Sequence, residues 1–471
     1  MLAPMRGRTA RGIAFALALA ATAPASAQRD APLELERPPD DEAAPPPMEP
    51  APDAELSPTR AERRGRLRRR LMPGGRPGVR SVENDDFEWL LLPLVGYSSD
   101  VGFGGAVLGL FFRYDDEHRP YRDRIQLVSS LTSELVQYHG LTWERVGAFD
   151  LPLRIESQAA FVGTKVGHYC GLGNGVTCAR EDAEAAANAA GLEDPGVRGR
   201  FLDRYHRFRI QRPQGLLRLR WQPRPKRAEI VFSWLGGYTF PGFIGARGPI
   251  EGSLYAADYP DGERGLQSEL RVGVVLDQRD DERRPSRGYV AAATLRGAHV
   301  GTGSDWDYFG LSLASSAYVA LDEGRRAVLA FRGVLDLLSG APPTFALGTV
   351  GGFWASPAYG GQFFGRGIRQ RRYLGAVKGI GQAELRWAFA GKPGKFQGTF
   401  QSFVDVGWVG YALDAFAGPV GSGGRLGRIL VGFGGGVGAS WGRQFVIRAD
   451  VGLSAVEAFD PQIYVQLTHP F

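Results

Sequence analysis

Ile463-Tyr-Val-Gln-Leu-Thr-His-Pro-Phe471 is the stretch that decides the fold, because its apolar and polar residues alternate. One side of this segment carries Ile463, Val465, Leu467 and Phe471. The other side carries Tyr464, Gln466 and Thr468. Strands of bacterial outer-membrane barrels turn apolar residues towards lipid and polar residues towards the lumen, and aromatic residues sit at the membrane interfaces. A last strand of this kind, ending on an aromatic residue, therefore predicts an outer-membrane β-barrel.

The same period of two recurs along the chain from Trp89 onward. Within residues 267–276, one side carries Leu270, Val272, Val274 and Leu276, and the other carries Gln267, Glu269, Arg271 and Gly273. Charges on the inner side do not suit a sandwich core, but they suit a barrel with a wet lumen. We predict an all-β fold, a closed transmembrane antiparallel β-barrel of about 16 strands, an even number as in single-chain bacterial barrels.

The predicted strands lie near 89–97, 101–113, 123–134, 136–147, 151–162, 205–221, 229–240, 266–277, 288–299, 306–320, 325–337, 380–390, 397–409, 429–440, 443–454 and 462–471. The segment 205–221 contains Pro213 and is either one strand or two pieces. The long connections are 163–204, 241–265, 338–379 and 410–428, and all fall on one side, which we predict to be extracellular.

Residues 1–27 have the pattern of a secretion signal peptide. The positive region contains Arg6, Arg8 and Arg11, the apolar stretch runs from Gly12 to Ala23, and Ala25-Ser26-Ala27 forms a small-residue cleavage site. The apolar stretch is too short for a transmembrane helix, which needs about 20 residues. These features predict export, and with the terminal strand they predict a location in the bacterial cell outer membrane.

Residues 28–84 contain no alternating pattern. An acidic region rich in proline, 32–58, is followed by a block of arginines between Arg60 and Arg80. Such biased blocks cannot bury a core, so we predict a disordered periplasmic tail. The alternative is a basic arm that contacts anionic lipid headgroups, the cell wall or an acidic partner. Residues 85–471 are then the barrel.

The overall charge gives no argument for a nucleic-acid partner. The chain has 56 basic and 50 acidic residues, a net charge of +6, and three of its arginines lie in the predicted signal peptide. The two cysteines, Cys170 and Cys178, would form a loop disulfide in an oxidising compartment, the alternative being two unpaired thiols. Only His168 lies close to them in sequence, so we expect no metal site, and no cofactor is implied.

Three segments carry recognisable motifs. Asp277-Gln-Arg-Asp-Asp-Glu-Arg-Arg-Pro-Ser-Arg-Gly-Tyr289 has the form of a D-x-R-D…P-x-R-G-Y turn, Gly360-Gly-Gln-Phe-Phe-Gly-Arg-Gly367 of a G-G…R-G loop tip, and Phe403-Val-Asp-Val-Gly407 of an F-x-D-x-G strand. Together with Gly432 to Ser440 and the terminal Phe471, these segments resemble, in order, the BamA/TamA family of outer-membrane assembly barrels, also called the bacterial surface antigen family. The resemblance covers roughly residues 85–471.

The resemblance implies a 16-stranded barrel whose long sixth extracellular loop folds into the lumen. Arg366 and Gly367 would lie at the loop tip, and Arg366 would pair with Asp405 on the inner wall. The planar donors of a guanidinium suit a carboxylate. Glu384, on the preceding strand, is the alternative acid.

The turn motif would supply a structural clasp through Asp277, Arg279, Asp280 and Gly288. The alternative is a charged turn held by local hydrogen bonds alone. The glycines of the run, which are Gly432, Gly434, Gly435, Gly436 and Gly438, would either make room for the inserted loop or let the strand bend.

The contact between the first and last strands is the functional focus of this family. Both strands carry a proline here, Pro93 and Pro470, the latter next to Phe471. Proline cannot donate a ladder hydrogen bond. We expect either a weakly paired seam that opens towards lipid, or prolines that only shorten the two strands.

The chain departs from the family in lacking an alternating pattern between residues 28 and 88, where relatives carry POTRA domains, and Ile368 replaces an aromatic residue. The resemblance implies a barrel that assists insertion or translocation of proteins or lipids. The alternative is a passive pore or structural surface barrel. Client outer-membrane or exported proteins are possible partners, as is a periplasmic accessory protein. We expect no enzyme activity, because His139 is the only candidate base and no serine and acid are placed beside it.

Overall fold

The computed structural model describes residues 87–98, 102–115, 117–118, 121–173, 175–176, 178–223, 228–243, 246–281, 284–352, 356–391, 396–411, 429–441 and 445–466. These residues belong to one compact unit, Arg76–Phe471. The predicted signal peptide, the predicted tail, and the seam residues Pro470 and Phe471 lie outside the described residues.

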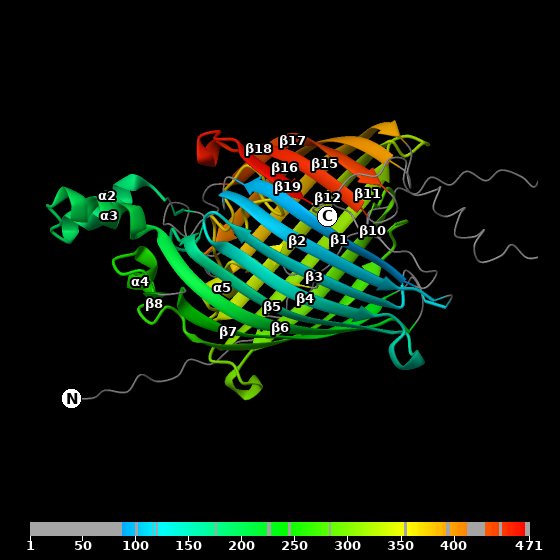
Figure 1. Cartoon of the computed structure of the whole chain (residues 1–471), viewed down its shortest axis with the longest axis horizontal. Coiled ribbons are helices and arrows are strands. Elements are labelled where there is room, and N and C mark those ends of the chain that lie inside the picture. The colour runs from blue at the N-terminus through cyan, green and yellow to red at the C-terminus, as the bar shows by residue number, and fades with distance from the viewer. Residues whose placement is uncertain are drawn as a thin grey trace, which may run out of the picture. The chain divides into compact units, whose positions relative to one another are not determined.

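Long antiparallel strands dominate this unit (Figure 1). The strands are β1 (Phe87–Ser98), β2 (Gly102–Arg113), β3 (Asp123–Thr132), β4 (Val136–Arg145), β5 (Leu153–His168), β6 (Arg207–Trp221), β7 (Glu229–Phe243), β8 (Ala246–Arg247), β9 (Gly265–Asp277), β10 (Gly288–Ala298), β11 (Tyr308–Ala320), β12 (Ala327–Gly340), β13 (Thr349–Val350), β14 (Ser356–Pro357), β15 (Val377–Gly391), β16 (Phe396–Gly410), β17 (Leu430–Trp441), β18 (Phe445–Leu453) and β19 (Gln462–Gln466). The short strands β13 and β14 pair with each other, and the other strands form a sheet of 17 that includes the two-residue β8.

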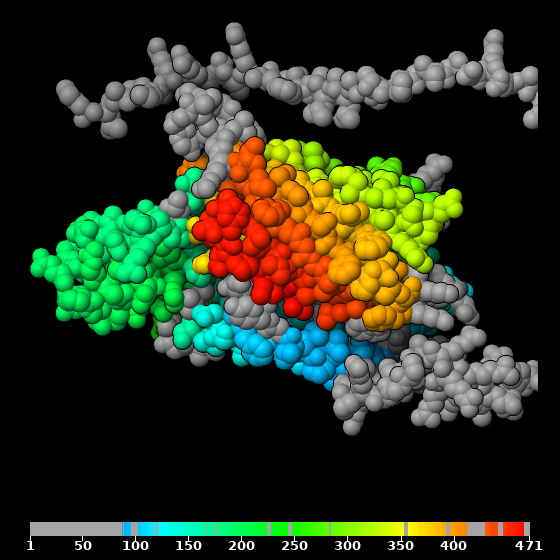
Figure 2. Space-filling model, turned by 90° about the horizontal axis from the view of Figure 1, so that it is seen from above, coloured from blue at the N-terminus to red at the C-terminus, as the bar shows by residue number. Residues whose placement is uncertain are grey.

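Each long strand pairs antiparallel with the long strand that follows it in the chain, from β1 to β19. This serial order curls the sheet until β19 contacts β1. Figure 1 shows the red end of the strand series beside the blue start, and Figure 2 shows the two surfaces adjoining. No hydrogen-bonded register joins β1 to β19 within their described residues. We call this contact the seam.

The two faces of the sheet have the inverted polarity that the sequence predicts. On β9, Leu270, Val272 and Val274 are 38%, 49% and 44% exposed, whereas Glu269 and Arg271 on the other face are 0% and 5% exposed. Apolar residues are therefore outside and charged residues inside. This arrangement suits a lipid environment, because a water-soluble sheet would bury its apolar face instead.

The strand boundaries follow the prediction closely. β5 differs, because it runs to His168, six residues beyond the predicted end. Of the two alternatives for residues 205–221, the structure has one continuous strand, β6, through Pro213. Pro213 pairs with Phe161 of β5, but the register between β6 and β7 passes from Gln211 to Gln214. The proline lies where a ladder hydrogen bond is skipped, so it does not break the strand.

Among the described residues, four α-helices occur in the connections: α2 (Arg180–Ala189), α3 (Pro195–Tyr205), α4 (Leu254–Asp258) and α5 (Thr344–Leu347). The helices α2 and α3 project beyond the end of the sheet (Figure 1). α3 begins at Pro195, after Asp194, whose side chain accepts a hydrogen bond from the Val197 backbone at 2.7 Å. Among the described residues, no helix is long and apolar enough to cross a membrane.

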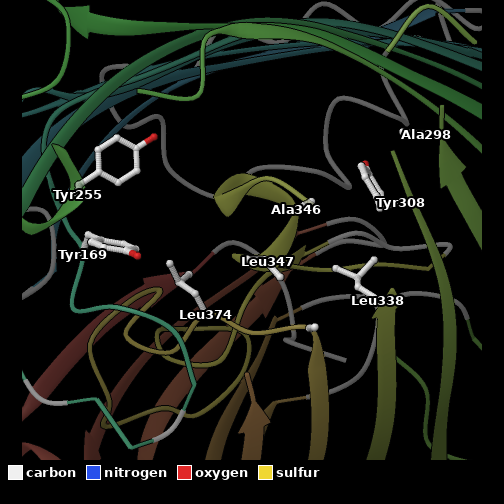
Figure 3. Packing of buried hydrophobic residues seen from close by; sticks show 9 residues of the cluster. Tyr169, Tyr255, Ala298, Tyr308, Leu338, Ala346, Leu347 and Leu374 are labelled. Carbon is white, nitrogen blue, oxygen red and sulfur yellow. The ribbon is translucent and has the colours of Figure 1, made fainter. Parts of the chain in front are cut away.

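One of the two large apolar clusters lies on the inner side, around α5. Figure 3 shows Ala346 and Leu347 of this helix between Tyr169 and Tyr255 on one side and Tyr308 on the other. α5 belongs to the long connection between β12 and β15, residues 341–376. This connection therefore packs inside the curve of the sheet, and we call it the inserted loop.

Candidate functional site

The tip of the inserted loop is a tight, fully buried turn. Its side chains Phe364, Arg366 and Ile368 are each 0% exposed. The Gly361 N–H donates to the Ile368 carbonyl at 2.8 Å, closing the turn. Gly367 has a φ of +96°, a conformation that side chains rarely adopt, so glycine is required there.

Arg366 is bound by acids from two neighbouring strands. Its Nε and Nη2 donate to the two carboxylate oxygens of Asp405 at 2.9 and 2.8 Å, and its backbone N–H donates to the same carboxylate at 2.9 Å. Its Nη1 donates to Glu384 at 2.6 Å. The guanidinium also lies over the Phe403 ring, 3.6 Å from its centroid. The structure thus brings Arg366 together with both candidate acids.

Further charged residues on the inner wall complete a network around Glu384. Arg386 donates to Glu384 at 2.7 Å, and both Nη atoms of Arg448 donate to it at 3.0 Å. The Nε of Arg448 also donates to Asp450 at 2.9 Å. We call the set Arg366, Glu384, Arg386, Asp405, Arg448 and Asp450 the lock cluster. Its three cations balance its three anions, as burial requires.

Glycines on two strands give the loop tip its room. A Cβ at Gly432 would lie 2.0 Å from the Arg366 carbonyl oxygen, and one at Gly452 would lie 2.4 Å from the Gly367 nitrogen. Real Cβ atoms do not approach backbone this closely. Room for the loop is therefore a sufficient reason for glycine at Gly432.

The last strand also contacts the loop tip. Tyr464 of β19 is 2% exposed and points inward. Its hydroxyl accepts a hydrogen bond from the Gly367 N–H at 3.2 Å and donates one to the Ile368 carbonyl at 3.3 Å. One side chain therefore joins the loop tip to the strand that borders the seam.

A second set of polar contacts holds the part of the loop that precedes the tip. Asp336 is 0% exposed and binds Arg296 at 2.9 Å and Lys378 at 2.8 Å. The same carboxylate accepts the backbone N–H of Gly351 at 3.1 Å. Glu263 accepts the backbone N–H of Thr344, at the start of α5, at 2.7 Å. The loop is thus attached to the wall at several points along its length.

The β9–β10 turn holds the residues of the D-x-R-D motif. Arg279 donates to both carboxylate oxygens of Asp277, at 2.9 and 2.6 Å. Asp280 accepts the backbone N–H of Ser286 at 2.9 Å and an Arg325 Nη1–H at 3.0 Å. Burial would raise the pKa of Asp280, but hydrogen bonds from Ser286 and the charge of Arg325 outweigh it and lower the pKa.

Gly288 closes the same turn with a φ of +96°, and a Cβ there would lie 2.1 Å from the Gln278 carbonyl oxygen. Most hydrogen-bond partners of the turn residues lie within the turn itself, although Arg325 belongs to the next hairpin. These contacts position the backbone of the turn.

The remaining candidate residues lie apart from the loop tip. Cys170 and Cys178 form a disulfide with Cα atoms 5.1 Å apart. Pro93 lies within β1, opposite Val107 of β2.

His139 lies on the outward face, where its Nδ1 is 2.8 Å from Ser129 Oγ, so a serine does lie beside it. The two residues face each other directly across β3 and β4. Among the described residues, no carboxylate contacts His139.

The alternation of residues 443–454 puts Arg448 and Asp450 on the inner face, and that of residues 462–471 puts Tyr464 there, but neither pattern names a partner. The alternating pattern was the only signal for them. Their contacts could not be predicted, because the partners lie far apart in the sequence: Tyr464 lies 97 residues from Gly367.

Part of the sequence matches a known protein family, and the fold is similar to solved structures. Residues 250–455 match the profile described as the Omp85 superfamily domain. The fold is similar to BamA from Haemophilus ducreyi lacking POTRA domains 1–3 (TM-score 0.50, 12% identity, 87% of this chain and 77% of that chain covered). It is also similar to CdiB from Escherichia coli (TM-score 0.50, 11% identity, 82% and 66% covered). At these identities the two likenesses concern the fold alone. No curated protein matches the sequence.

Proposed function

We propose, from the premise that this chain is a BamA/TamA-type Omp85 barrel of the bacterial outer membrane, that it assists the insertion or translocation of proteins there by opening at the seam. In this proposal sixteen long strands close into a barrel through contact of β1 with β19. The inserted loop, held by the lock cluster, fills the lumen and supports β19. No cofactor or turnover chemistry is required. Residues 1–27 would be removed on export, and 28–84 would form the periplasmic tail.

The observation that carries the proposal is the uneven attachment of β19. Residues Gln462 to Gln466 pair with β18 in a regular register. On the other side, β19 contacts β1, but no register joins the described residues of the two strands. An unpaired strand edge is a template for another strand. An edge at this position would let a client strand pair in the membrane.

Pro93 supports the same interpretation. It lies in the middle of β1 and has no N–H to donate. Pairing of β1 with β19 would therefore lack a donor at this position if the backbone of Pro93 faces the seam. Pro470, its predicted counterpart, lies outside the described residues.

The inserted loop supports a gated barrel over an open pore. Its tip and the lock cluster are fully buried and electrically balanced. A lumen filled in this way would pass small, flickering currents, whereas a passive pore would conduct steadily. Clients would then leave sideways, at the seam, after delivery by a periplasmic accessory protein.

A quantitative comparison of outer-membrane proteins and lipids in cells with and without this chain tests the proposal. Selective loss of a few barrels or exported proteins is expected, and their identities would name the clients. An unchanged set of proteins, with an imbalance of lipids between leaflets, would replace protein by lipid as the cargo. A membrane unchanged in both would contradict the proposal and favour a structural surface barrel.

Tyr464→Phe is expected to loosen β19 while the barrel remains folded. The substitution removes the hydroxyl that makes two hydrogen bonds to the loop tip. Each is worth about 0.5–1.5 kcal/mol, so local opening of β19 should rise by about tenfold. Amide hydrogen exchange measured on peptides of β18 and β19 checks this.

The matched control is Tyr289→Phe, which removes a hydroxyl from an exposed position on β10. Equal exchange of β19 in the two variants would show that the loop tip does not hold the last strand.

A further inference from the structure

Two cysteines and a histidine converge beside the inserted loop. Cys170 follows β5, Cys178 precedes α2, and His206 lies between α3 and β6. Both sulfurs and one ring nitrogen of His206 lie within 4.8 Å of one another. The α2–α3 hairpin is what returns His206 to the cysteines, because the chain leaves Cys178 and comes back through these two helices.

The two ring nitrogens of His206 are in different environments. Nε2 lies 3.1 Å from the Ala179 carbonyl oxygen, which can only accept, so Nε2 carries the hydrogen. Nδ1 is buried and has no hydrogen-bond partner among the residues that the structure describes. A neutral imidazole fixed by a backbone carbonyl, with its second nitrogen free, is the arrangement of a metal-binding histidine.

The sulfurs also lie against the inserted loop. Nη1 of Arg372, on the returning arm of this loop, lies 3.5 Å from Cys170 Sγ. Cys170 is 7% exposed, so the site is largely shielded from solvent.

We propose that Cys170, Cys178 and His206 form a binding site for one Zn²⁺ when the two cysteines are reduced. Reduction by a small-molecule thiol converts the disulfide to two thiols and oxidises two molecules of the reductant to their own disulfide. Zn²⁺ then displaces two protons, one from each thiol, and binds both thiolates and Nδ1 of His206. A water molecule completes the tetrahedral coordination. Soft sulfur with imidazole is a ligand set that zinc prefers.

The two states of the site tie different parts of the chain together. The disulfide closes a short loop, since the cysteines are 8 residues apart. The zinc form additionally ties this loop to the start of β6 through His206. The loop contacts the inserted loop where the Gly173 N–H donates to the Leu374 carbonyl at 2.7 Å. Metal binding would therefore stiffen the support of the inserted loop's returning arm.

Zinc binding by the purified full-length chain, in detergent, tests the proposal. The chain is prepared oxidised and, separately, reduced with a phosphine that is then removed under anaerobic conditions. The reduced chain is expected to bind one Zn²⁺ with release of close to two protons, and the oxidised chain none. Cobalt as a substitute ion should give the absorption of a tetrahedral thiolate site.

His206→Ala should weaken zinc binding at least about tenfold, since loss of an outer-shell partner alone costs that much. The matched control is His299→Ala, an exposed histidine elsewhere on the chain, which should bind as wild type. If His206→Ala does not fold, His206→Gln replaces it, with folding checked by heat-dependent gel mobility. Zinc binding equal in the His206 variant and wild type, or no binding by the reduced chain, would overturn the proposal.

Discussion

Arg366→Ala is expected to lower the free energy of unfolding by about 3–5 kcal/mol, the cost of breaking a buried ion pair by removing one partner. The guanidinium makes three hydrogen bonds to carboxylates, two to Asp405 and one to Glu384. Glu384 would keep Arg386 and Arg448, but Asp405 would lose its cation while 0% exposed. Asp405 is therefore the residue that makes the change severe.

Urea titration of the purified barrel, followed by heat-dependent gel mobility, measures the loss. The matched control is Arg369→Ala in the same loop, because Arg369 is 48% exposed and lies 3.5 Å from Glu457. Glu457 keeps a second cation, because Arg372 lies 3.8 Å from it, and a pair with one exposed partner contributes about 0–1 kcal/mol, so this variant should stay close to wild type. If the two variants lose equal stability, the lock cluster does not hold the loop.

Two further variants test why the loss of Arg366 is costly. They are Arg366→Lys and the double variant Arg366→Ala with Asp405→Ala. Lysine keeps the charge but cannot offer two parallel donors to Asp405, so it should recover only part of the loss. The double variant removes the unpaired carboxylate together with the arginine. Its loss should therefore be smaller than the sum of the two single losses.

Gly432→Ala is expected to displace the tip of the inserted loop from the inner wall. The added methyl group would lie 2.0 Å from the Arg366 carbonyl oxygen, and backbone cannot yield as the end of a flexible side chain can. Overpacking costs typically about 1–3 kcal/mol, and moving the tip also disrupts the contacts of Arg366. Single-channel recordings should show larger and steadier conductance than wild type.

The control for this variant is Gly379→Ala on β15, where an added Cβ meets nothing within 4 Å. Gly432 is not among the residues with positive φ, so alanine suits its backbone conformation. Any effect then comes from the close approach of the loop. Unchanged conductance and stability in Gly432→Ala would mean that strand bending, and not the loop, explains the glycine run.

The strands were predictable because the alternation of apolar and polar residues within each strand shows which side chains face outward. Along β9, the alternation of Leu270, Val272 and Val274 with Glu269 and Arg271 gives the face of each residue without knowledge of its neighbours. The contact of Arg366 with Asp405 was also anticipated, through the resemblance of two motifs. In the structure Glu384, written as the alternative, binds the same guanidinium.

The rest of the lock cluster was not predictable, because alternation gives the face but not the register between strands. Arg448 lies 64 residues from Glu384, and their contact depends on three successive strand pairings. The closeness of His206 to the two cysteines was not predicted, for a similar reason. Closeness in sequence pointed to His168, whereas the α2–α3 hairpin brings His206 to the two sulfurs.

The position of the lock cluster in the chain also sets when it can form during folding. Its members come from the inserted loop, β15, β16 and β18, and the tyrosine that joins the loop tip to β19 follows them at position 464. Contacts over separations of 39, 64 and 97 residues close slowly, because long loops lose much chain entropy. Local hairpins should therefore form first, and docking of the loop tip should be one of the last events. A chain that ends before β18 could form most of the sheet but could not complete the docking of the loop tip. Docking of the loop tip therefore marks the stage at which the last strands have been synthesised and folded.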